Sequence, residues 1–161
     1  MLEYRKRRRI RKKEAKRLAE EIIERWGDCP FSGENQVDLA ESGDMSLIFS
    51  DGMLVGMIYY GKAFLTVRGI LACNPDKKYV TVDMGAVKFL SNGADVMSPG
   101  VVDADPEIKE GDPVWVREER HGKPLVVGIA LMDGNSMKES KKGKAIKTIH
   151  YVGDKIWKFN E

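Results

Sequence analysis

Hydrophobic positions change their spacing along the chain, which separates one helical segment from a long strand-rich remainder. In residues 11–27 apolar side chains recur every three or four positions, no Gly or Pro interrupts them, and Gly27 ends the run. This spacing predicts an amphipathic helix. Its expected buried stripe is Ala15, Leu18, Ile22 and Trp26.

Short β-rich runs follow the helix, in the order VDLAES, MSLIFS, MLVGMIYY and AFLTVRGI. Asp51-Gly52 separates the second run from the third and is a strong hairpin signal, and Gly61-Lys62 is a second expected turn. The pattern predicts an α+β module over residues 1–73 with a basic N-terminal helix. The Asn-Pro-Asp of CNPDKK breaks both kinds of regular structure and indicates a linker.

A second group of short strands begins at residue 78. Asp83 is placed to cap a short helix, and Asn92-Gly93 is placed to end that helix in the left-handed conformation. Many short strands around one short helix predict a small β-barrel-like domain.

Positive charge is concentrated at the N-terminus. The first 17 residues contain ten Lys and Arg against Glu3 and Glu14, a net charge of +8, although the whole chain carries only +2. The segment lacks the interspersed Trp, Phe and Leu of a membrane-surface helix, so the expected polyanion is nucleic acid. The candidate contacts in this segment are Arg7, Arg8, Arg9, Arg11 and Lys12.

Residues 85–101, GAVKFLSNGADVMSPGV, contain a single cation and are interrupted by glycine and proline. Glycines let an RNA backbone or base approach the main chain, whose N–H groups can donate to it. This stretch, followed by EGDPVWV and PLVVGIALM, resembles the PUA domain, an RNA-binding pseudobarrel. The C-terminal KGKAIKTIHYVGDKIWKF resembles more narrowly the malignant-T-cell-amplified-sequence and ligatin family, and an archaeal member is expected.

The resemblance implies an α+β fold class, with a pre-PUA-like module over residues 1–73 and a PUA β-pseudobarrel over residues 78–155. It also implies a groove beside the short helix that holds an RNA terminus, in several members the CCA end of tRNA. The candidates carried over by position are Gly85, Lys88, Gly93, Ala94, Met97, Ser98, Pro99 and Gly100. Lys88 is the best single candidate, because a lone solvent-facing cation suits a phosphate.

Structural alternatives stay open for several of these residues. Gly93 is also a natural helix C-cap, and Pro99-Gly100 is also a simple corner. The last strand is preceded by a lysine cluster that would either neutralise phosphates or form a solvated loop. Its candidates are Lys141, Lys142 and Lys144. Arg117, Arg120 and Lys123 are weaker candidates, because Glu118 and Glu119 interleave with them.

The family resemblance further implies an RNA-binding protein that engages tRNA and rRNA on the small ribosomal subunit during initiation, re-initiation or recycling. In eukaryotic relatives a protein partner supplies an initiation-factor-like domain. A ribosome-biogenesis factor, or an accessory subunit that delivers tRNA to a modification enzyme, is the alternative. We expect a cytoplasmic protein, because no apolar run approaches the roughly 18 residues of a membrane span and the N-terminus lacks the apolar core of a signal peptide.

Nothing in the sequence indicates catalysis. About 77 residues precede the PUA-like segment, too few for a synthase or methyltransferase domain. The cysteines and histidines are too scattered to indicate zinc, and two isolated cysteines are typical of reduced thiols. We therefore expect a non-catalytic protein without a cofactor or metal.

Overall fold

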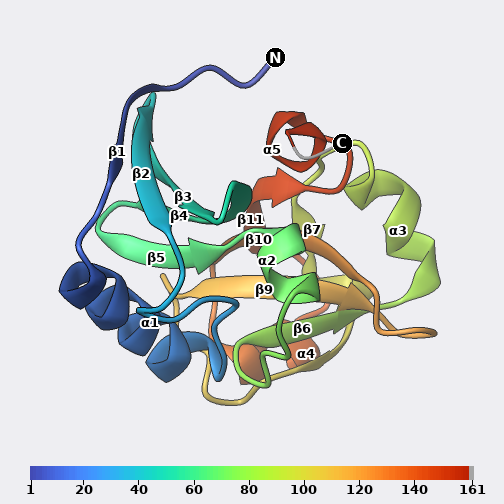
Figure 1. Ribbon diagram of the computed structural model, residues 1–161. Coiled ribbons are helices and arrows are strands. Elements are labelled where there is room, and N and C mark those ends of the chain that lie inside the picture. Colours follow the sequence, from blue (N-terminus) through green and yellow to red (C-terminus); the bar gives the residue numbers. More distant parts are fainter. Residues whose placement is uncertain (160–161) are drawn as a thin grey trace. The chain divides into compact units, whose positions relative to one another are not determined.

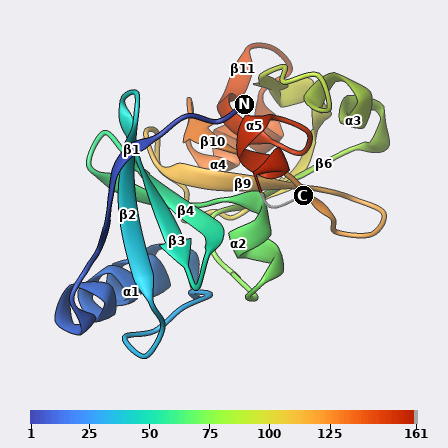
Figure 2. The same cartoon turned by 45° about the horizontal axis from the view of Figure 1, so that its top comes forward.

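The chain forms two structural units, seen in the computed structural model of Figures 1 and 2, which describes residues 1–159. The first unit contains residues 1–76 and a short C-terminal helix, α5 (Lys155–Lys158). The second unit is Lys77–Asp154. The predicted α+β fold class, a small mixed module followed by a β-pseudobarrel, is confirmed.

The first unit is an antiparallel five-stranded sheet in the order β1-β2-β3-β4-β5. Two helices accompany it, α1 (Lys12–Trp26) and α2 (Val67–Leu71). The strands are β1 (Arg5–Arg9), β2 (Val37–Ser42), β3 (Met45–Ser50), β4 (Met53–Tyr59) and β5 (Lys62–Leu65). In α1 the buried stripe is Ala15, Ala19, Ile22 and Trp26, so Ala19 replaces the predicted Leu18, which is only half-buried.

Two tight turns join the last three strands of this sheet. The predicted Asp51-Gly52 turn is confirmed, with φ of +49° and +87° between β3 and β4. The next turn lies one residue earlier than predicted, at Tyr60-Gly61, where φ is +49° and +72°. Both residues of each turn are therefore in the left-handed region, which matches the twist of a two-residue hairpin.

The helix predicted over residues 11–27 is α1, and residues 5–9, for which no element was predicted, lie outside it. They form β1, an edge strand paired with β2, and the helix begins only at Lys12. A row of cations suits an edge strand, because charge discourages pairing with another chain. The predicted strand AFLTVRGI is corrected, because β5 ends at Leu65 and the Thr66 hydroxyl accepts from the Gly69 N–H at 3.0 Å to begin α2.

The second unit is a six-stranded sheet in the order β7-β11-β10-β9-β6-β8, in which β6 and β9 run parallel. The helical elements are α3 (Met84–Leu90), the 3-10 turn η1 (Ser98–Gly100) and α4 (Gly134–Glu139). The strands are β6 (Tyr79–Val82), β7 (Val96–Met97), β8 (Val101–Ala104), β9 (Pro113–Glu118), β10 (Pro124–Ala130) and β11 (Lys144–Tyr151).

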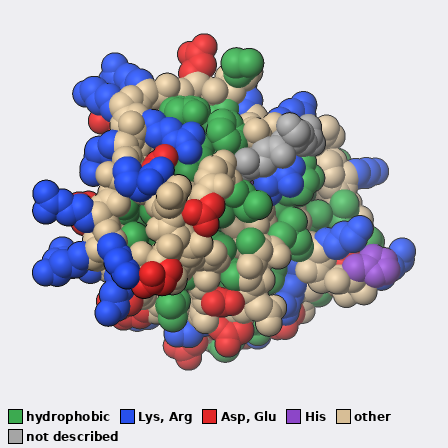
Figure 3. All heavy atoms as spheres, viewed as in Figure 1, with side chains coloured by type: hydrophobic (Ala, Val, Ile, Leu, Met, Phe, Trp, Pro, Cys, Tyr) green, Lys and Arg blue, Asp and Glu red, His purple; other side chains and the backbone are tan. Residues whose placement is uncertain are grey.

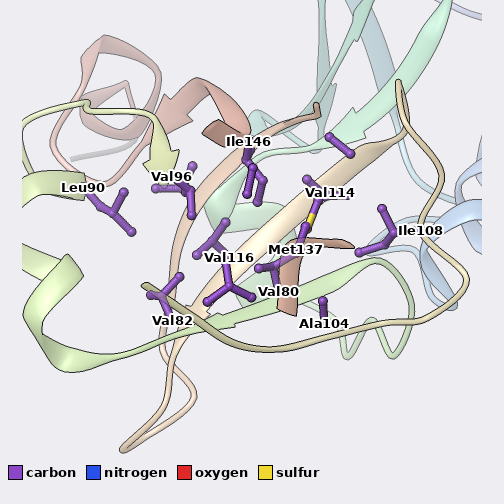
Figure 4. Close-up of a cluster of buried hydrophobic side chains, with 14 residues drawn as sticks. Val80, Val82, Leu90, Val96, Ala104, Ile108, Val114, Val116, Met137 and Ile146 are labelled. Atoms are coloured by element: carbon purple, nitrogen blue, oxygen red, sulfur yellow. The ribbon is translucent and has the colours of Figure 1, made fainter. Parts of the chain in front are cut away.

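The core of the second unit is a cluster of aliphatic side chains that converge from the strands and from α3 and α4 (Figure 4). Its members include Val80, Val82, Leu90, Val114, Val116 and Ile146. Helix α4 was not predicted from the sequence, which indicates only a lysine cluster ahead of the last strand. Asp133 caps it by accepting from the Ser136 N–H at 2.8 Å, and Met137 is fully buried in the core.

The C-terminal helix α5 packs within the first unit. The Arg68 guanidinium lies 3.9 Å from the centre of the Trp157 ring, and its Nε donates to the Trp157 carbonyl at 3.1 Å. Trp157 therefore belongs to the first unit. Within residues 1–159, no helix is both long enough and apolar enough to cross a membrane.

Candidate functional site

A pocket of about 620 Å³ opens on the second unit, between α3, the 3-10 turn η1 and the first residue of β11. Its volume is in the range of small-ligand sites. The lining residues are Asp83, Gly85, Ala86, Phe89, Leu90, Ala94, Asp95, Val96, Met97, Pro99, Gly100 and Lys144.

The pocket is shaped by how α3 begins. The Asp83 carboxylate accepts from the Ala86 N–H at 3.0 Å, which caps the helix as predicted. The Asp83 N–H donates to the Gly100 carbonyl at 2.9 Å, which ties the helix to η1. A Cβ at Gly100 would lie 3.4 Å from the Ala86 methyl, so η1 and the start of α3 come within about one van der Waals contact of each other.

Two large apolar side chains stand on the pocket wall in contact with solvent. Phe89 is 57% exposed and Met97 is 47% exposed, although both line the pocket. Aromatic and thioether groups of this kind bind flat, apolar ligand faces such as nucleobases. The wall can therefore hold a planar ring.

The charged groups of the pocket are two carboxylates and one ammonium. Lys144 Nζ lies 3.1 Å from an Asp95 carboxylate oxygen, and the Thr148 N–H donates to the same carboxylate at 2.9 Å. Burial alone would raise the pKa of Asp95, but these partners outweigh it and hold the pKa below its ordinary value. Because Asp95 pairs with Lys144 and Asp83 is also present, the pocket suits a neutral ring with N–H donors better than a phosphate.

Six of the predicted candidates line this pocket. They are Gly85, Ala94, Met97, Pro99, Gly100 and Lys144. Lys88 is exposed on α3 outside the lining, with its Nζ 5.1 Å from the centre of the Phe89 ring. Lys141 and Lys142 are exposed in the loop before β11.

Gly93 and Ser98 also lie outside the lining, and each has structural contacts. Gly93 has φ of +83° at the end of α3, and a Cβ there would come within 2.8 Å of the Tyr151 ring. Ser98 is 1% exposed, and its hydroxyl lies 3.3 Å from the Met132 sulfur. The positive φ of Gly93 confirms the predicted left-handed end of α3.

Phe89 and Asp95 line the pocket and are not among the residues predicted from the sequence. Phe89 follows Gly85 by four positions, and residues at this spacing share one face of a helix, so its position could have been predicted. For Asp95 no local signal exists, because it meets Lys144 only through the pairing of β7 with β11.

The cations of β1 are all exposed, and Lys and Arg side chains gather along the side of the first unit that contains β1 and α1 (Figure 3). Asp38 on β2 lies between Arg7 and Arg9 and accepts from both, at 2.9 Å from Arg7. Burial would raise the pKa of Asp38, but the two arginines lower it below its usual value. In the first unit, Lys12 pairs with Glu34 at 2.6 Å.

Arg8 and Arg11 make no ion pair with any residue that the structure describes. They are also exposed. Of the basic N-terminal candidates, these two are therefore the most available to an external polyanion.

The titratable groups elsewhere have structural roles. His150 is fully buried, with Nδ1 2.9 Å from an Asp154 carboxylate oxygen, so it is not available to stack on a base. Burial raises the pKa of the Cys29 thiol to about 11 and that of Cys73 to about 12, which keeps both thiols protonated near neutral pH. In the part of the chain that the structure describes, no cluster of His, Cys, Asp and Glu is arranged to hold a metal ion.

Known proteins that contain a PUA domain are similar to this chain over both of its units. Residues 78–152 match the family model of the PUA domain. The chain is 46% identical over 160 residues to an uncharacterized protein of Methanocaldococcus jannaschii, covering 98% of this chain and 99% of that one. It superimposes with a TM-score of 0.79 on a conserved PUA domain protein of Thermoplasma acidophilum, at 31% identity, over 94% of this chain and 97% of the other.

Two further relatives match part of the chain. Translation machinery-associated protein 20 of Schizosaccharomyces pombe is 35% identical over 102 residues, which are 61% of this chain and 56% of that protein. Malignant T-cell-amplified sequence 1-A of Xenopus laevis is 32% identical over 79 residues, 47% of this chain and 44% of that protein. The chain thus spans about half the length of these named relatives.

Proposed function

Because the chain belongs to the family of PUA-domain proteins that includes translation machinery-associated protein 20 and the malignant T-cell-amplified sequence proteins, we propose that its pocket binds an RNA 3′ end. The ligand is the CCA acceptor end of tRNA. The protein acts without catalysis, at the small ribosomal subunit, in initiation, re-initiation or recycling.

The observation that carries this proposal is the chemistry of the pocket walls. An adenine or cytosine ring would lie against Phe89 and Met97, the exposed apolar side chains of the lining. Both bases have an exocyclic amino group, which donates hydrogen bonds. The carboxylates of Asp83 and Asp95 line the same pocket, and each has lone pairs beyond those used by its partners in the protein, so both can accept from such a group. Every base of a CCA end therefore fits this donor and acceptor pattern, whereas uracil lacks the amino group.

The basic strand and the start of α1 supply the second part of the proposal. Arg8 and Arg11 are exposed cations, and in this role they contact rRNA phosphates without reading sequence. Arg7 and Arg9 contribute less, since Asp38 already neutralises part of their charge.

The test compares one tRNA with an intact CCA end and the same tRNA trimmed of it, across a salt titration. We expect the intact tRNA to bind more tightly, and the difference to persist at high salt because base contacts release no counterions. Phe89→Ala should weaken binding of the intact tRNA by about 1–3 kcal/mol, the typical contribution of one base stack. Binding of the trimmed tRNA should hardly change.

Leu71→Ala is the matched control, because Leu71 is 58% exposed and belongs to the first unit. Equal affinity for intact and trimmed tRNA would contradict the pocket assignment. Co-sedimentation with pre-ribosomes instead of mature small subunits would favour the biogenesis alternative. Association with a modification enzyme and with neither particle would favour an accessory subunit.

A further inference from the structure

The hairpin between β9 and β10 carries cations on a narrow, exposed tip. Residues 119–123 are five consecutive exposed residues, Glu119, Arg120, His121, Gly122 and Lys123, so cations outnumber the one exposed carboxylate. Figures 1 and 2 show this hairpin extending beyond the strands of the second unit. In Figure 3, histidine and Lys or Arg side chains gather where it ends.

Glu118, which in the sequence weakens the case for this hairpin, is turned away from the tip. It is only 4% exposed, and its carboxylate accepts from the backbone N–H groups of His121 and Gly122, the latter at 2.8 Å. Burial would raise the pKa of Glu118, but these backbone donors lower it below the ordinary value. The buried carboxylate therefore fixes the turn and does not pair with the side chains of Arg120 or Lys123.

The base of the hairpin adjoins the pocket. The Glu119 N–H donates to the Val82 carbonyl at 2.9 Å, and Val82 precedes Asp83, the first residue of the pocket lining. At about 3.3 Å per residue, the two or three residues to the tip reach roughly 10 Å from that point. An RNA strand that leaves the pocket on the side of Asp83 would pass within reach of the cations at the hairpin tip.

The pocket itself offers little free positive charge, since Lys144 is paired with Asp95. By contrast, Arg120 and Lys123 make no ion pair within residues 1–159. The phosphates on the 5′ side of a terminal base held in the pocket would need such unpaired cations.

We infer that the β9–β10 hairpin is a phosphate clamp, in which Arg120 and Lys123 contact the RNA backbone next to the nucleotide held in the pocket. This inference rests on the proposed binding of an RNA 3′ end. The tip carries no apolar side chain, so it lacks the anchors by which proteins and membranes are usually bound. The clamp adds affinity and orientation, whereas the pocket selects the terminal base.

The experiment measures binding of a 12-nucleotide single-stranded RNA ending in CCA, and of the same RNA without the CCA, at several salt concentrations. The variant is R120A/K123A. The control is K77A/K109A, which removes the same charge before the first residues of β6 and β9, at the strand ends opposite the hairpin. All four side chains are exposed, so both variants should fold, and thermal unfolding checks this.

Loss of two phosphate contacts should reduce the slope of log affinity against log salt by about 1.4 for a single strand. The ratio of the RNA affinity of the wild-type protein to that of R120A/K123A should therefore fall about sevenfold between 50 and 200 mM salt. The preference for the CCA end should be retained, and the control should keep the wild-type slope.

An unchanged slope in R120A/K123A, or an equal fall in the control, would overturn the clamp while leaving the pocket function intact. A wild-type protein that binds both RNAs equally would overturn the proposed function, and with it the clamp as stated here.

Discussion

Gly93 and Gly100 are both candidate RNA contacts, but the structure predicts that changing each to alanine affects a different property, stability in one case and RNA affinity in the other. Gly93 has φ of +83°, and an added Cβ would come within 2.8 Å of the Tyr151 ring. Gly100 lines the pocket, its added Cβ would be 3.4 Å from Ala86, and its φ lies outside the left-handed region. We expect Gly93→Ala to lower stability and Gly100→Ala to lower RNA affinity.

The magnitude for Gly93→Ala has two parts. A left-handed backbone costs an alanine roughly 1–2 kcal/mol relative to glycine. Pressing a methyl group into a packed ring costs about 1–3 kcal/mol more, because the ring must shift. The free energy of unfolding should therefore fall by about 2–5 kcal/mol. A loss of about 5 kcal/mol would equal the whole stability of a marginally stable domain.

Gly153→Ala separates the two parts. Gly153 has φ of +104° and nothing within 4 Å of its added Cβ, so this variant bears only the backbone cost of roughly 1–2 kcal/mol. The assay is urea unfolding of the wild-type protein and the three variants, followed by RNA binding at 10 °C under native conditions. If Gly93→Ala unfolded like Gly153→Ala, the contact with Tyr151 would carry no energy. If Gly93→Ala were as stable as the wild type but bound RNA weakly, the structural role assigned to Gly93 would be refuted.

Two further predictions concern the basic strand. R8A/R11A should reduce the salt slope of RNA binding by about 1.4 with unchanged unfolding, whereas R7A/R9A should lower stability, because it removes both partners of Asp38. Retained RNA affinity and slope in R8A/R11A would exclude this strand from RNA binding. Because the pKa of Asp38 is lowered by folding, its stabilisation is present above the ordinary Asp pKa near 4 and is lost as pH falls through the lower folded value. D38N should thus have a free energy of unfolding about 1 kcal/mol lower than that of the wild type at pH 7. Unfolding experiments below pH 4 should show a smaller difference. A difference that stayed the same at low pH would mean that the ion pairs contribute nothing.

The basic strand β1 is part of the fold of the first unit, so its role in RNA binding has to be tested by point substitutions. Ile10 is 6% exposed and its N–H donates to the Val37 carbonyl at 3.0 Å, so residues 1–13 are part of the first unit's fold. A deletion of this segment would remove an edge strand together with its charges. Point substitutions at Arg8 and Arg11 change the charge and leave the strand in place.

Much of the local structure was predictable, because its causes lie within a few residues. Asp83 caps α3 through its own carboxylate, Gly93 ends that helix because glycine accepts a positive φ, and Asp51-Gly52 forms its turn for the same reason. Five of the twelve pocket-lining residues, Gly85, Ala94, Met97, Pro99 and Gly100, were predicted from one contiguous stretch, residues 85–101, in which the spacing of glycines and apolar residues is itself the signal.

The sequence by itself therefore determined the α+β class, the helix caps, the Asp51-Gly52 hairpin and most of the pocket's glycine-rich side. Only the tertiary structure decided that Arg5–Arg9 is a strand, that Asp38 neutralises two of its arginines, that Asp95 pairs with Lys144 and that Glu118 faces inward. These outcomes depend on strand pairing and on which carboxylate lies opposite which cation. Charge along a sequence gives no information about such pairing, because the partner is tens of residues away and is brought near only when the sheet forms.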